Sequence, residues 1–138
     1  MKIFLDANIL VSVLNKEYPV FSFSSRILSL ADNKKFEIFT SPLCLAIAFY
    51  FAEKKHKTVK AKEKIKLLCE YIQITSNSRQ AVSRALDNPA VHDFEDGLEY
   101  YAALEDDCKC IITEDISDFY FSEIEILNSE SFCNKYLI

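Results

Sequence analysis

The sequence predicts an α/β fold with a largely parallel sheet, and three observations support this class. Short apolar runs recur between stretches with helical spacing, which is typical of strands that alternate with helices. The run Ile3-Phe4-Leu5 has no polar alternation, as expected of a strand buried on both faces of a parallel sheet. No linker, repeat or low-complexity tract divides the chain, so we expect residues 1–138 to form a single domain.

The predicted elements follow from apolar periodicity and from helix-start residues. The expected strands are 2–5, 36–39, 72–74, 110–113 and 124–127. The expected helices begin near residue 8 and cover 22–33, 43–53, 58–71, 78–86, 93–106 and 129–136. Ser41-Pro42 is a typical start for the helix at 43–53, and that helix is apolar almost all round, which predicts deep burial.

The composition is that of a globular domain without a membrane span. Half of the residues are hydrophobic, 27% are charged, and no apolar run approaches the roughly 20 residues that cross a bilayer. Asp6 and Asn8 interrupt the N-terminal apolar run, so we expect no signal peptide and a cytoplasmic protein. The five cysteines are scattered and odd in number, which argues against a disulfide framework. Cys108 and Cys110 lack the second pair that a zinc site needs.

Three aspartates occupy positions where the acids of an α/β fold can converge. Asp6 directly follows the first strand, Asp115 lies just past the strand at 110–113, and Asp96 lies near the start of the helix at 93–106. Ligands of such sheets bind outside the carboxyl ends of the strands, so we expect these side chains to share one crevice. Converging carboxylates repel one another, and a hard divalent cation relieves the repulsion. The set suits a Mg²⁺ or Mn²⁺ site that hydrolyses phosphodiesters.

Each of these acids also has a structural explanation, which the sequence leaves open. Asp6 can cap the helix that begins near residue 8, and Asp115 can start a turn. Asp93 is predicted to be the N-cap of its helix, where the helix dipole favours acids in the first turn. Asn8 and Thr113 can orient the acids through hydrogen bonds or can cap locally.

An ordered set of short motifs covers essentially the whole chain. The motifs are Phe4-Leu5-Asp6-Ala7-Asn8-Ile9-Leu10, Ser41-Pro42-Leu43, Asp93-Phe94-Glu95-Asp96-Gly97-Leu98, Tyr100-Tyr101-Ala102-Ala103, Ile111-Ile112-Thr113-Glu114-Asp115 and Asp118-Phe119. Each motif alone is weak, whereas the ordered set is fairly specific. In this order and spacing the chain resembles the PIN-domain ribonucleases, including the VapC-type toxins of toxin–antitoxin pairs.

The resemblance implies a PIN-like three-layer α/β/α domain with a parallel sheet of about five short strands. It implies a metal-dependent endoribonuclease in which Asp6, Asp96 and Asp115 bind Mg²⁺ or Mn²⁺ and Asp118 assists as a further catalytic acid. The implied partners are an RNA substrate, an antitoxin protein and a second copy of the chain in a homodimer, with no membrane. The family's second acid falls at Ile47, the one departure from the pattern.

Neither of two nearby acids is placed to replace the one missing at Ile47. Glu53 lies about a turn and a half further along the helix, and Glu37 precedes the Ser-Pro turn. The departure leaves an alternative function open, a catalytically degenerate PIN domain that binds RNA or a protein without cutting. A phosphatase with Asp6 as nucleophile is disfavoured, because Asp6-Ala7-Asn8 lacks a second aspartate.

Basic and aromatic side chains allow two interpretations each. The lysine-rich stretch at 54–66 can contact RNA phosphates or form a solvated helix face, against a net charge of −5. The aromatic residues Phe49, Tyr50 and Phe51 are expected in the core or in a dimer interface. The only histidines are His56, in the lysine run, and His92, in a loop, so they do not indicate metal-free acid–base cleavage.

Overall fold

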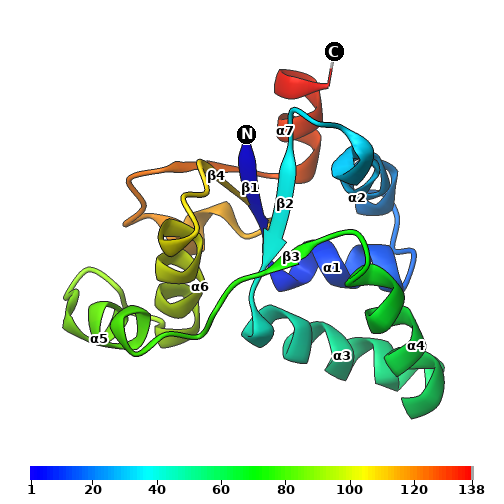
Figure 1. The fold of residues 1–138 in the computed structure, drawn as a ribbon, viewed down its shortest axis with the longest axis horizontal. Coiled ribbons are helices and arrows are strands. Elements are labelled where there is room, and N and C mark those ends of the chain that lie inside the picture. Colours follow the sequence, from blue (N-terminus) through cyan, green and yellow to red (C-terminus); the bar gives the residue numbers. More distant parts are fainter. Residues whose placement is uncertain (138) are drawn as a thin grey trace.

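The computed structural model describes residues 1–137 and has a five-stranded parallel sheet between layers of helices (Figure 1). The strands are β1 (Lys2–Leu5), β2 (Glu37–Thr40), β3 (Gln73–Ile74), β4 (Cys110–Ile112) and β5 (Glu125–Leu127). Their order is β3-β2-β1-β4-β5, and every neighbouring pair is parallel. The predicted three-layer α/β/α class with about five short strands is confirmed. The chain leaves β1 toward β2 and returns to its other side at β4, so a crevice is expected at the carboxyl ends of β1 and β4.

Helices cover both faces of the sheet and extend past one end of it. The helices of the described residues are α1 (Ala7–Leu14), α2 (Val20–Leu28), α3 (Pro42–His56), α4 (Thr58–Leu68), α5 (Arg79–Asp87), α6 (Phe94–Glu105) and α7 (Ser129–Tyr136), with 3-10 turns η1 (Ser29–Asp32) and η2 (Ile116–Phe119). In Figure 1, α5 and α6 lie on one side of β1 and β2, and α1 and α2 lie on the other, with α7 packed against α2. None of these helices combines the length and apolar character needed to cross a membrane.

The centre of the core is formed by β1 and the strands beside it. Ile3, Phe4 and Leu5 are all buried, as the unbroken apolar run predicts. Phe4 is in register with Phe39 on β2 and with Ile111 on β4. Each fully buried side chain of this size contributes about 1.5–3 kcal/mol relative to exposure. The strand ends are therefore fixed in space, and with them the residues that follow.

Side-chain caps fix the starts of the helices that reach the carboxyl edge of the sheet. Asp93 accepts hydrogen bonds from the backbone N–H groups of Glu95 at 2.8 Å and Asp96 at 3.4 Å, which confirms its predicted role as the N-cap of α6. Ser41 accepts one from the N–H of Cys44 at 3.1 Å, and Pro42 occupies the first position of α3.

Gly97 lets α6 approach its neighbours closely. A methyl group added at this position would lie 2.7 Å from Cγ1 of Val91 and 3.0 Å from Cβ of Ala85 on α5. Both distances are shorter than ordinary contacts between carbon atoms. The only glycine in the chain thus holds the first turn of α6, which carries Asp96, tightly against α5.

The predicted deep burial of the helix at 43–53 is wrong. Only Cys44, Ala48 and Ala52 of α3 are buried, whereas Tyr50 is 52% exposed and Phe51 is 45% exposed. The reason is the position of the helix, because α3 and α4 extend beyond the end of the sheet and α3 packs mainly on α1 and α4 (Figure 1). An apolar composition without a dominant face does not reveal how many neighbours will cover a helix.

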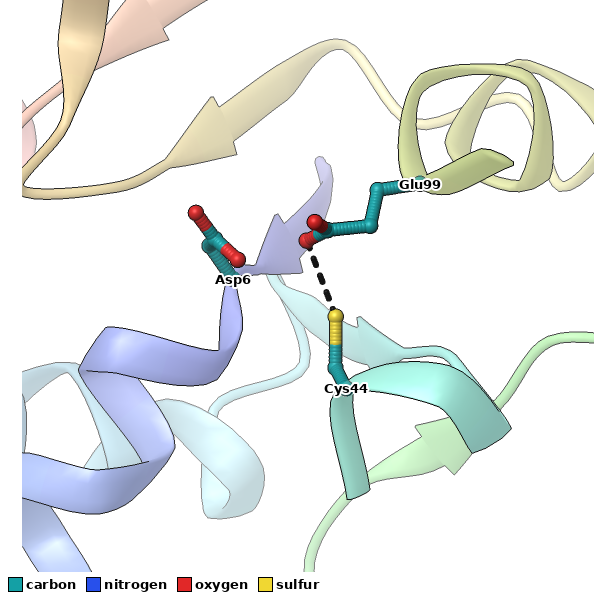
Figure 2. A group of neighbouring side chains, drawn as sticks. All are labelled: Asp6, Cys44 and Glu99. Carbon is teal, nitrogen blue, oxygen red and sulfur yellow. Dashed lines mark hydrogen bonds between the residues drawn. The ribbon is translucent and has the colours of Figure 1, made fainter. Parts of the chain in front are cut away.

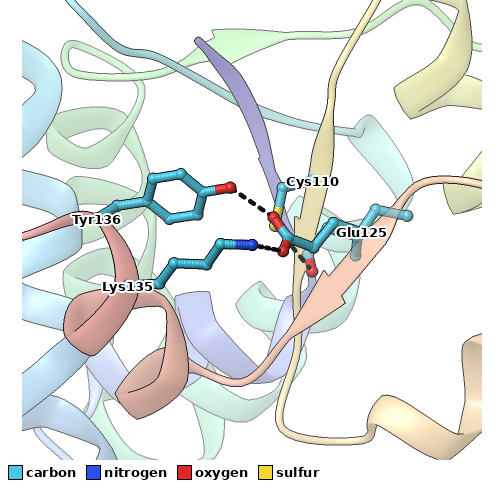
Figure 3. A network of polar contacts seen from close by, with 5 residues as sticks. Cys110, Glu125, Lys135 and Tyr136 are labelled. Carbon is cyan, nitrogen blue, oxygen red and sulfur yellow. Dashed lines mark hydrogen bonds and ion pairs between the residues drawn. The ribbon is translucent and has the colours of Figure 1, made fainter.

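The last helix is tied to the edge strand β5 by a polar network (Figure 3). Lys135 forms an ion pair with Glu125, and the hydroxyl of Tyr136 donates a hydrogen bond to Oε1 of Glu125 at 2.6 Å. Both hydrogen bonds hold the pKa of Glu125 below its ordinary value. The half-buried carboxylate of Glu125 therefore has its ion-pair and hydrogen-bond partners within the chain itself.

Candidate functional site

An acidic cleft of about 470 Å³ opens at the carboxyl ends of β1 and β4. Four of its lining residues are the predicted acids Asp6, Asp96, Asp115 and Asp118, although the first and the last are 112 residues apart in the sequence. The other lining residues are Ala7, Asn8, Val11, Glu17, Ile47, Phe51, Asp93, Glu95 and Glu99. Within residues 1–137, no lysine, arginine or histidine lines the cleft. Carboxylates thus face one another here without a positive side chain between them.

Asn8 and Thr113 connect the acids at the ends of β1 and β4. The hydroxyl of Thr113 donates to Oδ2 of Asp6 at 2.8 Å, and the side-chain amide of Asn8 donates to Oγ1 of Thr113 at 3.1 Å. The same amide donates to Oδ2 of Asp115 at 3.2 Å. The two residues therefore orient Asp6 and Asp115, one of the two roles that the sequence left open.

Asp6 has two structural functions in addition to its place in the cleft. It is the N-cap of α1, since Oδ1 accepts the N–H of Ala7 at 2.6 Å, and it is only 8% exposed. Capping uses Oδ1, whereas Oδ2 faces Thr113. The cap explanation and a role in the cleft are compatible for this residue.

Asp96 sits half-buried in the first turn of α6. Burial, followed by repulsion from Asp93 and Asp118, raises the pKa of Asp96 to about 7. Desolvation, followed by repulsion from Asp115, also raises the pKa of Asp118, which lies at the exposed rim. Crowding with other acids therefore makes it harder for Asp96 and Asp118 to lose their protons, and a bound cation would offset this effect.

Glu99 is a residue of the cleft that the sequence analysis did not single out. It is 3% exposed, and its carboxyl group lies between Asp6 and Cys44 (Figure 2). The thiol of Cys44 donates to Oε1 of Glu99 at 2.9 Å, and one donor atom each from Asp6, Cys44 and Glu99 lie within 4.8 Å of one another. Burial, a hydrogen bond to Asp6 and repulsion by Asp6 raise the pKa of Glu99 to about 11. Burial and the neighbouring Glu99 also raise the pKa of the Cys44 thiol well above its usual range.

A signal for Glu99 was present in the sequence. Residues three apart on a helix share a face, so Asp96 and Glu99 point to the same side of α6. The family pattern predicts the further acid on the helix at 43–53, so it does not indicate Glu99.

The acids weighed as substitutes for Ile47 do not reach the cleft. Ile47 itself lines the cleft as an apolar wall. Glu53 accepts a hydrogen bond from Thr58 at 2.8 Å, and Glu37 begins β2 at the opposite end of that strand from the cleft. The prediction that neither residue replaces the α3 acid is confirmed.

The donor set of the cleft suits a hard divalent cation. Apart from the Cys44 thiol, the groups that converge are carboxylate oxygens, the ligands that Mg²⁺ and Mn²⁺ prefer. The carboxyl groups of Asp6 and Glu99 are buried. Among residues 1–137, no positive side chain lines the cleft beside them. A divalent ion held by oxygens would compensate both burial and mutual repulsion.

The other chemically active side chains of the sequence lie outside the cleft. His92 packs against Tyr120 with ring centroids 5.3 Å apart and does not line it. Lys60, Lys62 and Lys66 on α4 are exposed and also do not line it. All five cysteines are free, as expected for a chain without a disulfide framework.

Comparisons with known proteins agree with this fold. A family model described as PIN domain matches residues 2–117. Ribonuclease VapC1 of Aquifex aeolicus (strain VF5) is 28% identical over 139 residues, which cover 98% of this chain and 95% of that protein.

Three solved structures share the fold at low sequence identity. VapBC2 from Rickettsia felis, bound to a DNA fragment from their promoter, has a TM-score of 0.70 and 21% identity, covering 93% of this chain and 98% of the other. VapBC-1 from nontypeable Haemophilus influenzae has a TM-score of 0.68 and 16% identity, covering 94% of this chain and 99% of the other. VapC20 of Mycobacterium tuberculosis is described as a Sarcin-Ricin loop cleaving toxin. It has a TM-score of 0.66 and 14% identity, covering 89% of this chain and 98% of the other.

Proposed function

The chain belongs to the PIN domain family, and from this membership we propose that it is a metal-dependent ribonuclease that hydrolyses RNA phosphodiesters. The observation that carries the proposal is the convergence of Asp6, Asp96 and Asp115 in one cleft that no basic residue lines within residues 1–137. A phosphodiester is itself an anion, so a cleft of this charge can accept one only together with cations. Mg²⁺ or Mn²⁺ meets that need with oxygen ligands.

Asp6, Asp96 and Asp115 are the proposed ligands of the ion. When bound, Mg²⁺ or Mn²⁺ would neutralise charge on the phosphate and lower the pKa of a coordinated water. Thr113 and Asn8 keep the Asp6 and Asp115 carboxylates in fixed orientations, which reduces the reorganisation needed on binding. Asp118 lines the exposed rim of the cleft and is proposed to assist as a further catalytic acid, for which accepting a proton from the attacking water is the proposed role.

The proposed setting is a cytoplasmic toxin–antitoxin pair. Two of the similar structures are described as VapBC, and the matching relative is named as a VapC ribonuclease. The chain is accordingly proposed to be restrained by an antitoxin protein and to form a homodimer. Light scattering of the purified chain, alone and co-expressed with its genomic neighbour, tests both associations.

RNA cleavage with and without Asp96 tests the proposed function. Wild type should cleave a single-stranded RNA in Mn²⁺ and stop when EDTA is added, and Asp96→Asn should be slower by at least about a hundredfold. Asp96 is a cleaner choice than Asp6, because Asp6 also caps α1. Glu130→Gln is the control, since it removes one negative charge from the exposed surface of α7. Equal cleavage by wild type and Asp96→Asn would reject the proposal.

The apolar wall at Ile47 supports one alternative, a PIN domain that binds RNA or a protein without cutting it. Ile47→Glu separates the two functions, because it adds a carboxylate to the same cleft. A chain that cleaves RNA only as Ile47→Glu is a binding module in its native form. Circular dichroism must show that α3 remains folded in the variant.

A further inference from the structure

Glu99 is placed like a member of the acidic site and unlike a surface glutamate of α6. It is almost completely buried, and its carboxyl group lies beside that of Asp6 (Figure 2). Asp96 precedes it by one helical turn on the same helix face. Together Asp96 and Glu99 let α6 deliver two carboxyl groups to one side of the cleft.

The opposite wall of the cleft offers no carboxylate of its own. The two α3 residues that line it are Ile47 and Phe51, both apolar. Cys44, the third residue of α3, is buried and donates a hydrogen bond from its thiol to Glu99. The side chain of Glu99 therefore reaches toward the part of the site that α3 leaves without an acid.

The surroundings of Glu99 do not suit a buried carboxylate anion. A buried carboxyl group is usually paired with a basic side chain or with several hydrogen-bond donors. The partners of Glu99 are another acid, Asp6, and a weak donor, the thiol of Cys44. Such a group becomes favourable when a cation binds between the carboxylates.

From this geometry we infer that Glu99 is a ligand of the divalent ion and supplies the carboxylate that α3 lacks at Ile47. The inference rests on the proposed metal-dependent function and assigns a further residue to that site. The ion would then be held by Asp6 just after β1, by the two acids of α6 and by Asp115 after β4. Cys44 is a positioning residue, because hard cations favour the oxygen over the protonated thiol.

Mn²⁺ affinity tests the inference without depending on catalysis. Electron paramagnetic resonance counts free Mn²⁺ during titration of the folded chain at pH 7.5. Glu99→Gln should bind Mn²⁺ at least about tenfold more weakly than wild type, as expected for loss of a direct ligand. Glu125→Gln is the matched control, since Glu125 already has Lys135 and Tyr136 as partners, and its affinity should equal that of wild type. Glutamine copies the shape of a protonated glutamate, so the variant should fold.

The outcomes separate this inference from the proposed function. If Asp96→Asn loses Mn²⁺ binding while Glu99→Gln keeps it, Glu99 is structural and the nuclease site stands without it. If wild type itself binds no Mn²⁺, both the inference and the metal-dependent function fail.

A crystal of wild type soaked in Mn²⁺ gives an independent result. An anomalous peak in contact with the Glu99 carboxylate supports direct ligation. A peak held by the aspartates alone, with Glu99 still bonded to Cys44, overturns it.

Discussion

Glu99 and Glu125 are both drawn into the protein, and they differ in what surrounds the carboxyl group. Lys135 and Tyr136 donate to Glu125, and its pKa is lowered by these bonds (Figure 3). Glu99 faces Asp6 and Cys44 instead, and its pKa is raised to about 11 by burial and by Asp6 (Figure 2). The first environment stabilises an anion, and the second stabilises an anion only after something positive is added.

The contrast teaches how to tell a structural carboxylate from a binding one. Glu125 links α7 to β5 and needs nothing from outside the chain. The acids of the cleft repel one another, and within residues 1–137 no basic residue lines that cleft. A site whose charges repel one another without a ligand is stabilised most when a ligand of opposite charge binds.

The largest expected effect is on RNA cleavage. Glu99→Gln should slow Mn²⁺-dependent cleavage by on the order of a hundredfold, because the ligand set and the charge near the phosphate both change. Glu125→Gln should leave the rate unchanged, since its carboxylate lies on β5 and does not line the cleft. Single-turnover rates with a labelled single-stranded RNA measure both. A similar loss of cleavage rate in Glu99→Gln and Glu125→Gln would contradict the assignment of different roles to the two glutamates.

The next effect is on stabilisation by the ion. Mn²⁺ at one hundred times its dissociation constant should raise the free energy of unfolding of wild type by about 2.7 kcal/mol. At the same Mn²⁺ concentration, Glu99→Gln should gain only about 1.4 kcal/mol if its affinity is tenfold lower. Glu125→Gln should start from a lower stability and still gain the full increment. Urea unfolding with Mn²⁺ or with EDTA measures each value, and an equal gain in wild type and Glu99→Gln contradicts the assignment.

The fold and the convergence of Asp6, Asp96 and Asp115 could be predicted from the sequence, because strand ends and one helix start determine where these acids lie. The apolar run before Asp6 and the strand before Asp115 predict neighbouring carboxyl ends, and β1 pairs with β4 as this requires. The start of α6 could be predicted from Asp93, whose cap places Asp96 in the first turn. These inferences need only local pattern and parallel topology.

Glu99 and the exposure of α3 could not be predicted in the same way. Whether Glu99 meets a lysine or an aspartate depends on contacts with β1 and α3 that are distant in sequence. The exposure of Tyr50 and Phe51 depends on how far α3 extends past the sheet, which apolar composition does not encode. Local patterns predict elements, whereas partners of buried polar groups come from tertiary packing.

The two glutamates should give opposite pH dependences of stability in EDTA. Glu99 has a raised pKa, so the folded chain keeps a proton that the unfolded chain releases above about pH 4.5. The contribution of Glu99 to the free energy of unfolding is complete below that pH and is lost as the pH rises. The free energy falls by at most about 1.4 kcal/mol per pH unit. Glu125 has a lowered pKa, so its contribution is present above pH 4.5 and is lost as the pH falls.

Urea unfolding between pH 7 and 8 isolates the Glu99 part of this prediction. Asp96 has a pKa of about 7, so it contributes less to the slope of stability against pH over this range than at lower pH. Stability of wild type should fall across the interval, and Glu99→Gln should show a shallower slope. Parallel slopes in the two proteins would mean that Glu99 does not retain its proton.

The smallest effect concerns the satisfied site. Tyr136→Phe removes one hydrogen bond to Glu125 and should lower the free energy of unfolding by about 1 kcal/mol. The loss is limited because Lys135 still pairs with the carboxylate. Mn²⁺ affinity should not change, since α7 and β5 contribute no residue to the lining of the cleft. Weaker Mn²⁺ binding by Tyr136→Phe would show that the two carboxylates are coupled, and the cleft acids would then depend on the anchoring of α7.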